Sequence, residues 1–178
     1  MNERIKPLND CREGEGECVV YVMSRDQRVD DNHALLAAQA CALEKKLPLL
    51  VVFFVYKKSG YRAREHYLFM LEGLRKVEEK LAKLDIGFSI YVADSKNAIV
   101  SHLQNIQPAQ LYFDFSPLRG PRTLQHKVAT ELQIPTFTVD THNVVPVWVA
   151  SNKQEYAART LRPKITKLLS VAYHTRCN

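Results

Sequence analysis

The sequence has few of the features that mark an enzyme that works alone or a membrane protein. It contains only six glycines and no G-x-G-x-x-G or P-loop pattern, so we expect no glycine-rich phosphate cradle. Neither G-x-S-x-G nor H-E-x-x-H occurs, which argues against the hydrolase and zinc-protease classes that use them. The longest apolar run, residues 47–56, is broken by Pro48 and is too short to cross a bilayer. We therefore expect no catalytic motif and no membrane partner.

Cysteine is also scarce, and its spacing excludes the common metal sites. The four cysteines show neither C-x-x-C spacing nor a metal-binding pattern, so we expect reduced thiols and no metal site at Cys11, Cys18, Cys41 and Cys177. The first ten residues, MNERIKPLND, carry both charge signs and no apolar core, which is not typical of a secretory signal. Both observations indicate an intracellular protein, cytoplasmic or nuclear.

The composition is that of one globular domain with polar ends. Of 178 residues, 46% are hydrophobic and 25% are charged. Residues 1–17 are rich in acids and include Gly14 and Gly16, which predicts a disordered arm. Most of the net charge of +6 comes from the basic tail at 151–178. Such a tail could contact phosphates, or it could be an ordinary solvated helix face.

Apolar strands alternate with amphipathic helices along the middle of the chain. Alternation of this kind predicts a doubly wound α/β fold: a five-stranded parallel sheet, Rossmann- or flavodoxin-like, with helices on both faces. The flavodoxin-like strand order is the simplest of these. A loop is expected at 57–60, after the second strand. We predict strands at 19–23, 49–55, 88–92, 110–115 and 136–140, and helices at 33–46, 62–84, 96–106 and from Pro121 onward.

The polar loop after the first strand is the first candidate site. It lies where parallel strands end, which is where ligands bind in open α/β sheets, and its helix can be capped by Asp31 or Asn32. Arg25 and Arg28 offer forked donors, and Asp26 accepts hydrogen bonds. These groups could hold a heterocycle or a phosphate. Alternatively, they form an internal ion-pair cluster that fixes the loop and caps the helix.

A second candidate follows the fourth strand, at Asp114 and Phe115. If the first and fourth strands are neighbours, this pair comes close to the first loop. A carboxylate beside an aromatic ring suits an aromatic ligand that carries donors, although Asp, Ser and Pro are also ordinary turn residues. Phe54, near the end of the second strand, could supply a flat wall or simply pack in the core.

His142 is a weaker candidate. It could act as a base or a metal ligand, but no second ligand stands at metal-binding spacing. A hydrogen-bonded structural histidine is the commoner role.

Three long segments make the sequence similar to a known family. MSRDQRVDDN at 23–32, FDFSPLR at 113–119 and VDTHNVVPVWVASNKQEYAARTLRPKI at 139–165 resemble class II cyclobutane-pyrimidine-dimer DNA photolyases. The likeness runs from about residue 4 to about residue 169. It covers the amino-terminal α/β antenna domain of that family, at 18–150, and a stretch at 151–165 that resembles its interdomain linker.

The resemblance implies a light-harvesting role. In the family this domain can hold an accessory chromophore, 8-hydroxy-deazaflavin or methenyl-folate, which passes excitation energy to FAD in a following helical domain. We expect this helical flavin domain to be missing from the chain, and therefore expect no repair of DNA by the chain alone. DNA would be a partner only through the missing domain, which a separate flavin-domain partner could supply.

The resemblance also implies a set of chromophore-binding residues. They are the loop residues Met23, Ser24, Arg25, Asp26 and Arg28 and the pocket walls Phe54, Asp114 and Phe115. The sequence departs from many relatives at Val22 and His33, where Trp is common, and at Val147, where Cys is common.

Other functions are compatible with the same architecture, since fold does not fix function. A fragment of a working photolyase, a nucleotide-binding module and an interaction-only module with an empty pocket remain alternatives. Trp148 is the only tryptophan, so the chain has no tryptophan relay of its own.

Overall fold

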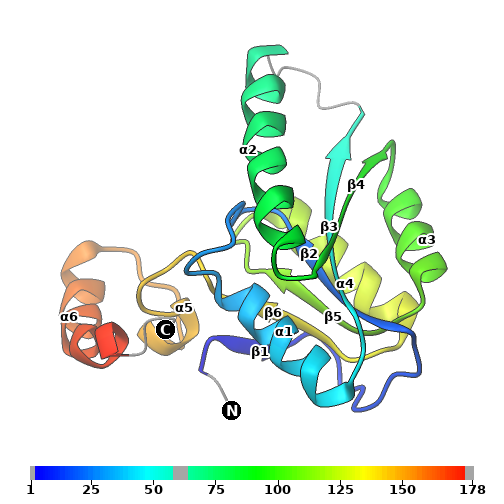
Figure 1. Ribbon diagram of the computed structural model, residues 1–178. Helices are drawn as coiled ribbons and strands as arrows, with labels where there is room; N and C mark the ends of the chain where they lie inside the picture. Colours follow the sequence, from blue (N-terminus) through cyan, green and yellow to red (C-terminus); the bar gives the residue numbers. More distant parts are fainter. Residues whose placement is uncertain (1–2, 58–63, 175–178) are drawn as a thin grey trace.

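The computed structural model describes residues 3–57 and 64–174 and shows one mixed sheet flanked by helices (Figure 1). Arg176, Cys177 and residues 58–60 of the loop expected at 57–60 lie outside the described residues. The strands are β1 (Ile5–Pro7), β2 (Cys18–Met23), β3 (Leu49–Tyr56), β4 (Gly87–Ala93), β5 (Pro108–Asp114) and β6 (Thr136–Val139). The helices are α1 (His33–Lys45), α2 (Arg64–Ala82), α3 (Lys96–Ile106), α4 (Arg119–Leu132), α5 (Val147–Ala150) and α6 (Ala158–His174).

The five expected strands form the parallel part of the sheet. The strand order is β1-β6-β5-β2-β3-β4, and β2 to β6 pair in parallel. If the five expected strands are numbered 1 to 5 along the chain, they lie in the sheet in the order 3-2-1-4-5, which is a Rossmann-type order. The flavodoxin-like order is wrong, because α3 carries the chain from β4 at one edge back to β5 beside β2. The doubly wound fold is confirmed, and the first and fourth expected strands are neighbours.

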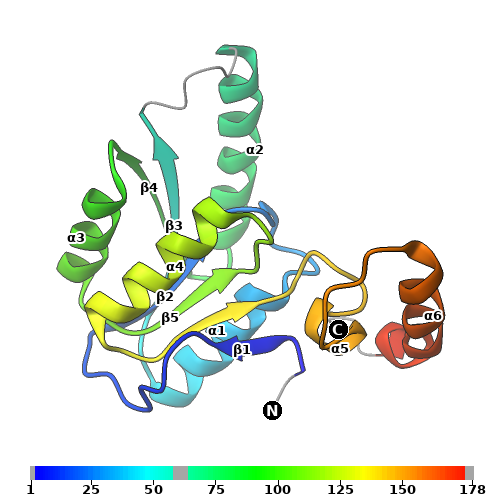
Figure 2. The ribbon, with the colours of Figure 1, turned by 180° about the vertical axis from the view of Figure 1, so that it is seen from behind.

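Helices cover both faces of the sheet because successive strand residues point to opposite sides. Tyr21 and Met23 pack with α1 and α2, while Val20 and Val22 pack with α3 and α4. α1 and α2 face the viewer in Figure 1, and α4 faces the viewer in Figure 2, which is turned by 180°. All six residues of β2 are buried, as expected for the central strand of a covered sheet.

Local sequence sets the helix ends. Asn32 caps α1 by accepting the Leu35 N–H at 2.9 Å, and Ser95 caps α3 by accepting the Ala98 N–H. In α2 the apolar stripe is buried only in its second half, at Leu74, Val77 and Leu81. The first half of α2 extends beyond the sheet (Figure 1).

The amino-terminal arm is ordered over its described part, so the expectation of disorder at 1–17 is wrong there. β1 pairs antiparallel with β6 and adds a sixth strand. The buried Arg4 guanidinium donates to the carbonyl oxygens of Asp140, Asn143 and Val144 at 3.0, 2.8 and 2.6 Å. A Cβ at Gly16 would lie 2.3 Å from the Ala109 nitrogen, so glycine there permits close packing on β5.

The segment after β6 forms two helices. α5 and α6 contact each other and lie to one side of the sheet in both views (Figures 1 and 2). Within 3–57 and 64–174, no helix is both long and apolar enough to span a membrane.

Candidate functional site

A cavity lies where the strand order reverses between β2 and β5. We call it the switch-point cavity. It has a volume of about 290 Å³, at the lower end of the range of small-molecule sites. Such a crevice at the carboxyl ends of the strands is the usual ligand position in open α/β sheets. It is lined by Val22, Met23, Ser24, Phe54, Tyr56, Lys96, Phe113, Gly120, Pro121, Leu124 and Gln125.

The walls of the switch-point cavity are apolar and partly aromatic. Phe54 and Tyr56 come from β3 and Phe113 from β5. Two rings pack edge-on against Phe54. Its ring centroid is 6.0 Å from that of Tyr91 and 5.9 Å from that of His102. Packing of this kind fixes the Phe54 ring as a rigid flat surface.

Few polar groups reach the switch-point cavity. Ser24, Tyr56, Lys96 and Gln125 are its lining residues with polar side-chain groups, and Lys96 is half-buried at the start of α3. No acidic side chain is among the described residues that line this cavity. The cavity thus combines an apolar slot with one cationic group and three uncharged polar ones.

Asp114 organises the loop beside the cavity. One carboxylate oxygen accepts the Tyr21 hydroxyl at 2.6 Å, and the other accepts the backbone amides of Ser24, Arg25 and Asp26 at 2.8, 2.8 and 3.2 Å. Asp114 is fully buried. Burial raises the pKa of Asp114, and the Tyr21 and backbone donors oppose this rise. The pKa of Tyr21 is also raised, because it is buried beside this carboxyl group.

The remainder of the loop is an internal ion-pair and hydrogen-bond cluster. Arg28 pairs with the buried Asp26 carboxylate at 2.6 Å, and His142 Nδ1 lies 3.4 Å from the same oxygen. The Asn32 side-chain amide donates to the Tyr21 hydroxyl and to the carbonyl oxygens of Asp26 and Arg28. The alternative that the cluster fixes the loop and caps the helix therefore describes this geometry.

The structure separates the eight expected site residues into two groups. Met23, Ser24 and Phe54 line the switch-point cavity. The other five do not line this cavity, and their contact with a chromophore stays a prediction. Asp114 and Asp26 are buried within the loop cluster, Arg28 pairs with Asp26, Arg25 donates to the Phe115 carbonyl oxygen at 3.2 Å, and Phe115 lines a different cavity with Trp148.

Several lining residues were missed from sequence. Pro121, Leu124 and Gln125 come from the sheet-facing side of α4, whose position over β2 depends on the strand order. Tyr56 and Phe113 lie at strand ends, so the alternation of strands and helices could have indicated them. In the described ranges, no group of three or more His, Cys, Asp or Glu side chains could hold a metal ion.

The chain belongs to the DNA photolyase family, whose pattern matches residues 19–177. It is similar to deoxyribodipyrimidine photo-lyases of known sequence. It is 43% identical to the protein of Potorous tridactylus over 167 residues and 41% identical to that of Arabidopsis thaliana over 153 residues. It is 33% identical to the protein of Methanothermobacter thermautotrophicus over 171 residues. These matches cover 92%, 85% and 94% of the chain but only 31%, 31% and 37% of the relatives.

Solved structures support the fold. A class III photolyase from Agrobacterium tumefaciens matches with a TM-score of 0.62 at 15% identity, over 83% of this chain and 32% of that one. A photolyase from Sulfolobus tokodaii, described with two FAD molecules and a novel light-harvesting cofactor, matches with a TM-score of 0.61 at 15% identity. That match covers 83% of this chain and 34% of the other.

Proposed function

We propose that this chain is the light-harvesting α/β segment of a class II photolyase and that the switch-point cavity holds an antenna chromophore. The observation that carries the proposal is an apolar, flat-walled cavity at the reversal of strand order, in a chain of the photolyase family. The class II assignment rests on the motifs at 23–32, 113–119 and 139–165. The chain spans about a third of its curated relatives, so repair of pyrimidine dimers in DNA, with its FAD, is assigned to the whole photolyase.

The cavity walls suit a flat dye. A rigid aromatic surface at Phe54 and the apolar side chains of Val22 and Leu124 would exclude water from a fused ring system and hold its orientation. The small volume suits the ring system itself, with polar substituents left at the cavity mouth. When bound, such a dye absorbs blue or near-ultraviolet light and transfers excitation to a flavin.

Lys96 favours one of the two candidate dyes. Among the lining residues that the structure describes, its ammonium group is the only charge. The 8-hydroxyl group of a deazaflavin can ionise to an oxyanion, which an ammonium group would stabilise. The ring system of methenyl-folate carries a cationic methenyl bridge, and placing that bridge beside the ammonium group would be unfavourable. We therefore propose 8-hydroxy-deazaflavin as the preferred chromophore.

Titration of the purified chain with each dye, followed by dye fluorescence anisotropy, tests the proposal. We expect saturable binding of 8-hydroxy-deazaflavin. Leu124→Arg should weaken it by about tenfold or more because a charged chain enters the slot, and Lys96→Gln by about three- to tenfold. Leu118→Arg is the matched control, since Leu118 is exposed and outside the cavity lining.

The outcomes separate the proposal from its alternatives. Equal binding by the wild type and by folded Leu124→Arg protein would place the dye elsewhere. Binding of methenyl-folate in preference to 8-hydroxy-deazaflavin would overturn the role of Lys96. Absence of binding by either dye would contradict the antenna role.

A further inference from the structure

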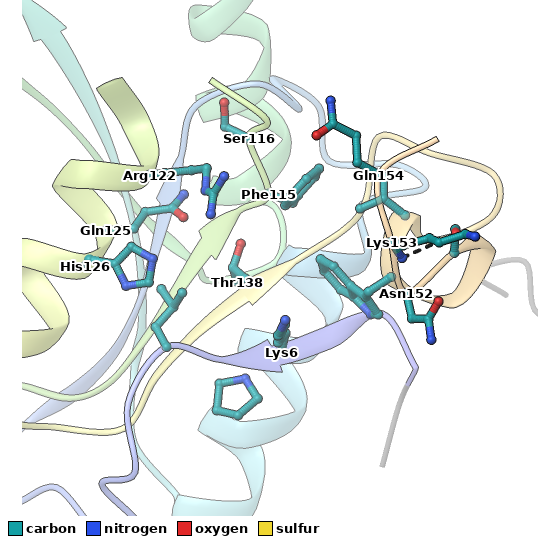
Figure 3. Close-up of a pocket in the computed structure, with 15 residues that line it drawn as sticks. Lys6, Phe115, Ser116, Arg122, Gln125, His126, Thr138, Asn152, Lys153 and Gln154 are labelled. Carbon is teal, nitrogen blue, oxygen red and sulfur yellow. Dashed lines mark hydrogen bonds between the residues drawn. The ribbon is translucent and has the colours of Figure 1, made fainter. Parts of the chain in front are cut away.

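A second, larger cavity lies on the other side of the end of β5 (Figure 3). We call it the basic cavity. Its volume is about 660 Å³, well within the range of small-molecule sites. It is bounded by β1, β6, α4, α5 and the segment that follows α5. Gln125 lines both this cavity and the switch-point cavity, and its side-chain amide donates to the Asp114 carbonyl oxygen at 2.8 Å.

Positive charge converges on the basic cavity from three parts of the chain. Lys6 comes from β1, Arg122 and His126 from one face of α4, and Lys153 from the segment after α5. Arg122 and His126 are four residues apart and therefore share a helix face. No Asp or Glu is among the lining residues in the described part of the chain. Three permanent cations without a facing carboxylate leave a site complementary to an anion.

Thr138 supplies a second, independent indication of a ligand. It is 5% exposed, and its Oγ1 atom has no hydrogen-bond partner within the described ranges 3–57 and 64–174. Thr138 is the antiparallel partner of Lys6, so the two side chains stand beside each other on one face of the sheet. In Figure 3 the hydroxyl group points toward Arg122 and Phe115, into the cavity. A buried hydroxyl group without a partner is costly, and an oxygen-rich ligand would remove that cost.

Aromatic rings form the remaining wall. The ring centroids of Phe115 and Trp148 are 5.4 Å apart, with an interplanar angle of 87°. The Trp148 indole N–H donates to the Glu3 carbonyl oxygen at 2.6 Å, which fixes the ring at the cavity edge. Rings beside a cluster of cations suit a ligand with a flat base and a phosphate group, because a base can stack where the phosphate pairs with Lys or Arg.

We propose that the basic cavity binds a nucleoside phosphate, with the phosphates at Lys6, Arg122 and Thr138 and the base at Phe115 and Trp148. This site is separate from the proposed chromophore slot. Arginine and lysine provide charge-assisted hydrogen bonds to phosphate oxygens, and the Thr138 hydroxyl donates one more.

Because Trp148 is the only tryptophan in the chain and lines this cavity, its emission reports binding directly. The experiment is a titration of the 178-residue chain with ADP, followed by tryptophan fluorescence and by the melting temperature, with adenosine and inorganic phosphate as separate probes. We expect ADP to change the emission saturably and to raise the melting temperature. Arg122→Gln and Lys6→Gln should each weaken ADP about tenfold, and Thr138→Val about threefold.

Matched variants keep the test decisive. Lys127→Gln, on the same helix but outside the cavity lining, should bind ADP like the wild type. Arg122→Gln should still bind the dye proposed for the switch-point cavity, so the two proposals can fail separately. Arg122 and Lys6 are exposed, so their variants should fold, which far-ultraviolet circular dichroism checks.

The proposal is overturned if ADP at millimolar concentration changes neither the emission nor the melting temperature, or if folded Arg122→Gln protein binds ADP like the wild type. If adenosine binds as tightly as ADP, the phosphate group does not contribute to binding and the proposed role of the cations is wrong. If inorganic phosphate binds as tightly as ADP, the nucleoside does not contribute and the proposed role of the aromatic rings is wrong.

Discussion

Replacing Asp114 by alanine tests the hydrogen-bond cluster that holds the loop beside the switch-point cavity. The substitution removes the acceptor for the Tyr21 hydroxyl and for the backbone amides of Ser24, Arg25 and Asp26. A buried donor left without a partner costs about 1–3 kcal/mol, so four such donors set an upper limit well above the effect of an ordinary substitution. Two effects make the expected loss of stability smaller than this limit. Water can enter the space that the side chain leaves. In addition, burying the ionised carboxylate, which raises the pKa of Asp114, already lowers the stability of the wild type.

We therefore expect Asp114→Ala to lower the free energy of unfolding by about 2–4 kcal/mol. Asp114→Asn keeps one acceptor oxygen and should cost about 1–2 kcal/mol. Urea unfolding at pH 7, followed by circular dichroism and by Trp148 emission, measures both. A loss below about 0.5 kcal/mol for Asp114→Ala, or a larger loss for Asp114→Asn than for Asp114→Ala, would refute the reasoning.

Other predictions concern the parts that hold the sheet and its helices. Gly16→Ala should cost about 1–3 kcal/mol of unfolding free energy, because its Cβ would meet β5 backbone at 2.3 Å; an unchanged urea midpoint contradicts this. Arg4→Gln should cost about 2–3 kcal/mol because three carbonyl oxygens lose a buried charged donor, which thermal unfolding would detect. Burial lowers the pKa of His102 and His33, so the unfolded chain binds more protons and stability should fall as the pH drops through about 6.5. His102→Gln should make the melting temperature fall less steeply as the pH drops. An unchanged dependence of the melting temperature on pH would exclude His102 as a cause.

Local patterns along the chain are enough to predict the parallel core of the sheet. β2 and β3 are continuous apolar runs, and Pro48, Gly87, Pro108 and Pro135 separate helices from strands. The pattern could not reveal β1, because a three-residue edge strand depends on pairing with β6 rather than on its own apolar content. Two glycines in an acidic segment, Gly14 and Gly16, are typical of disorder, but in the structure close packing on Ala109 explains them.

The candidate site was only partly predictable for a related reason. Met23, Ser24 and Phe54 lie at strand ends, so their place at the cavity follows from the topology. Whether a charged loop residue faces a ligand or its own neighbours depends on side-chain geometry that spacing does not contain. In this loop the side chain of Arg28 pairs with Asp26, and the backbone amides of Arg25 and Asp26 donate to Asp114. These groups therefore bond within the loop cluster and do not line the cavity.

The central claim is that a chromophore enters the switch-point cavity, which Leu124 lines from α4. Leu118 is exposed and outside the cavity lining, so it serves as the control. In protein labelled with ¹³C at the leucine methyl groups, saturating 8-hydroxy-deazaflavin should shift the Leu124 resonances, assigned with Leu124→Ile, and leave those of Leu118, assigned with Leu118→Ile, unchanged. Bound dye that leaves the Leu124 resonances unchanged would contradict the account.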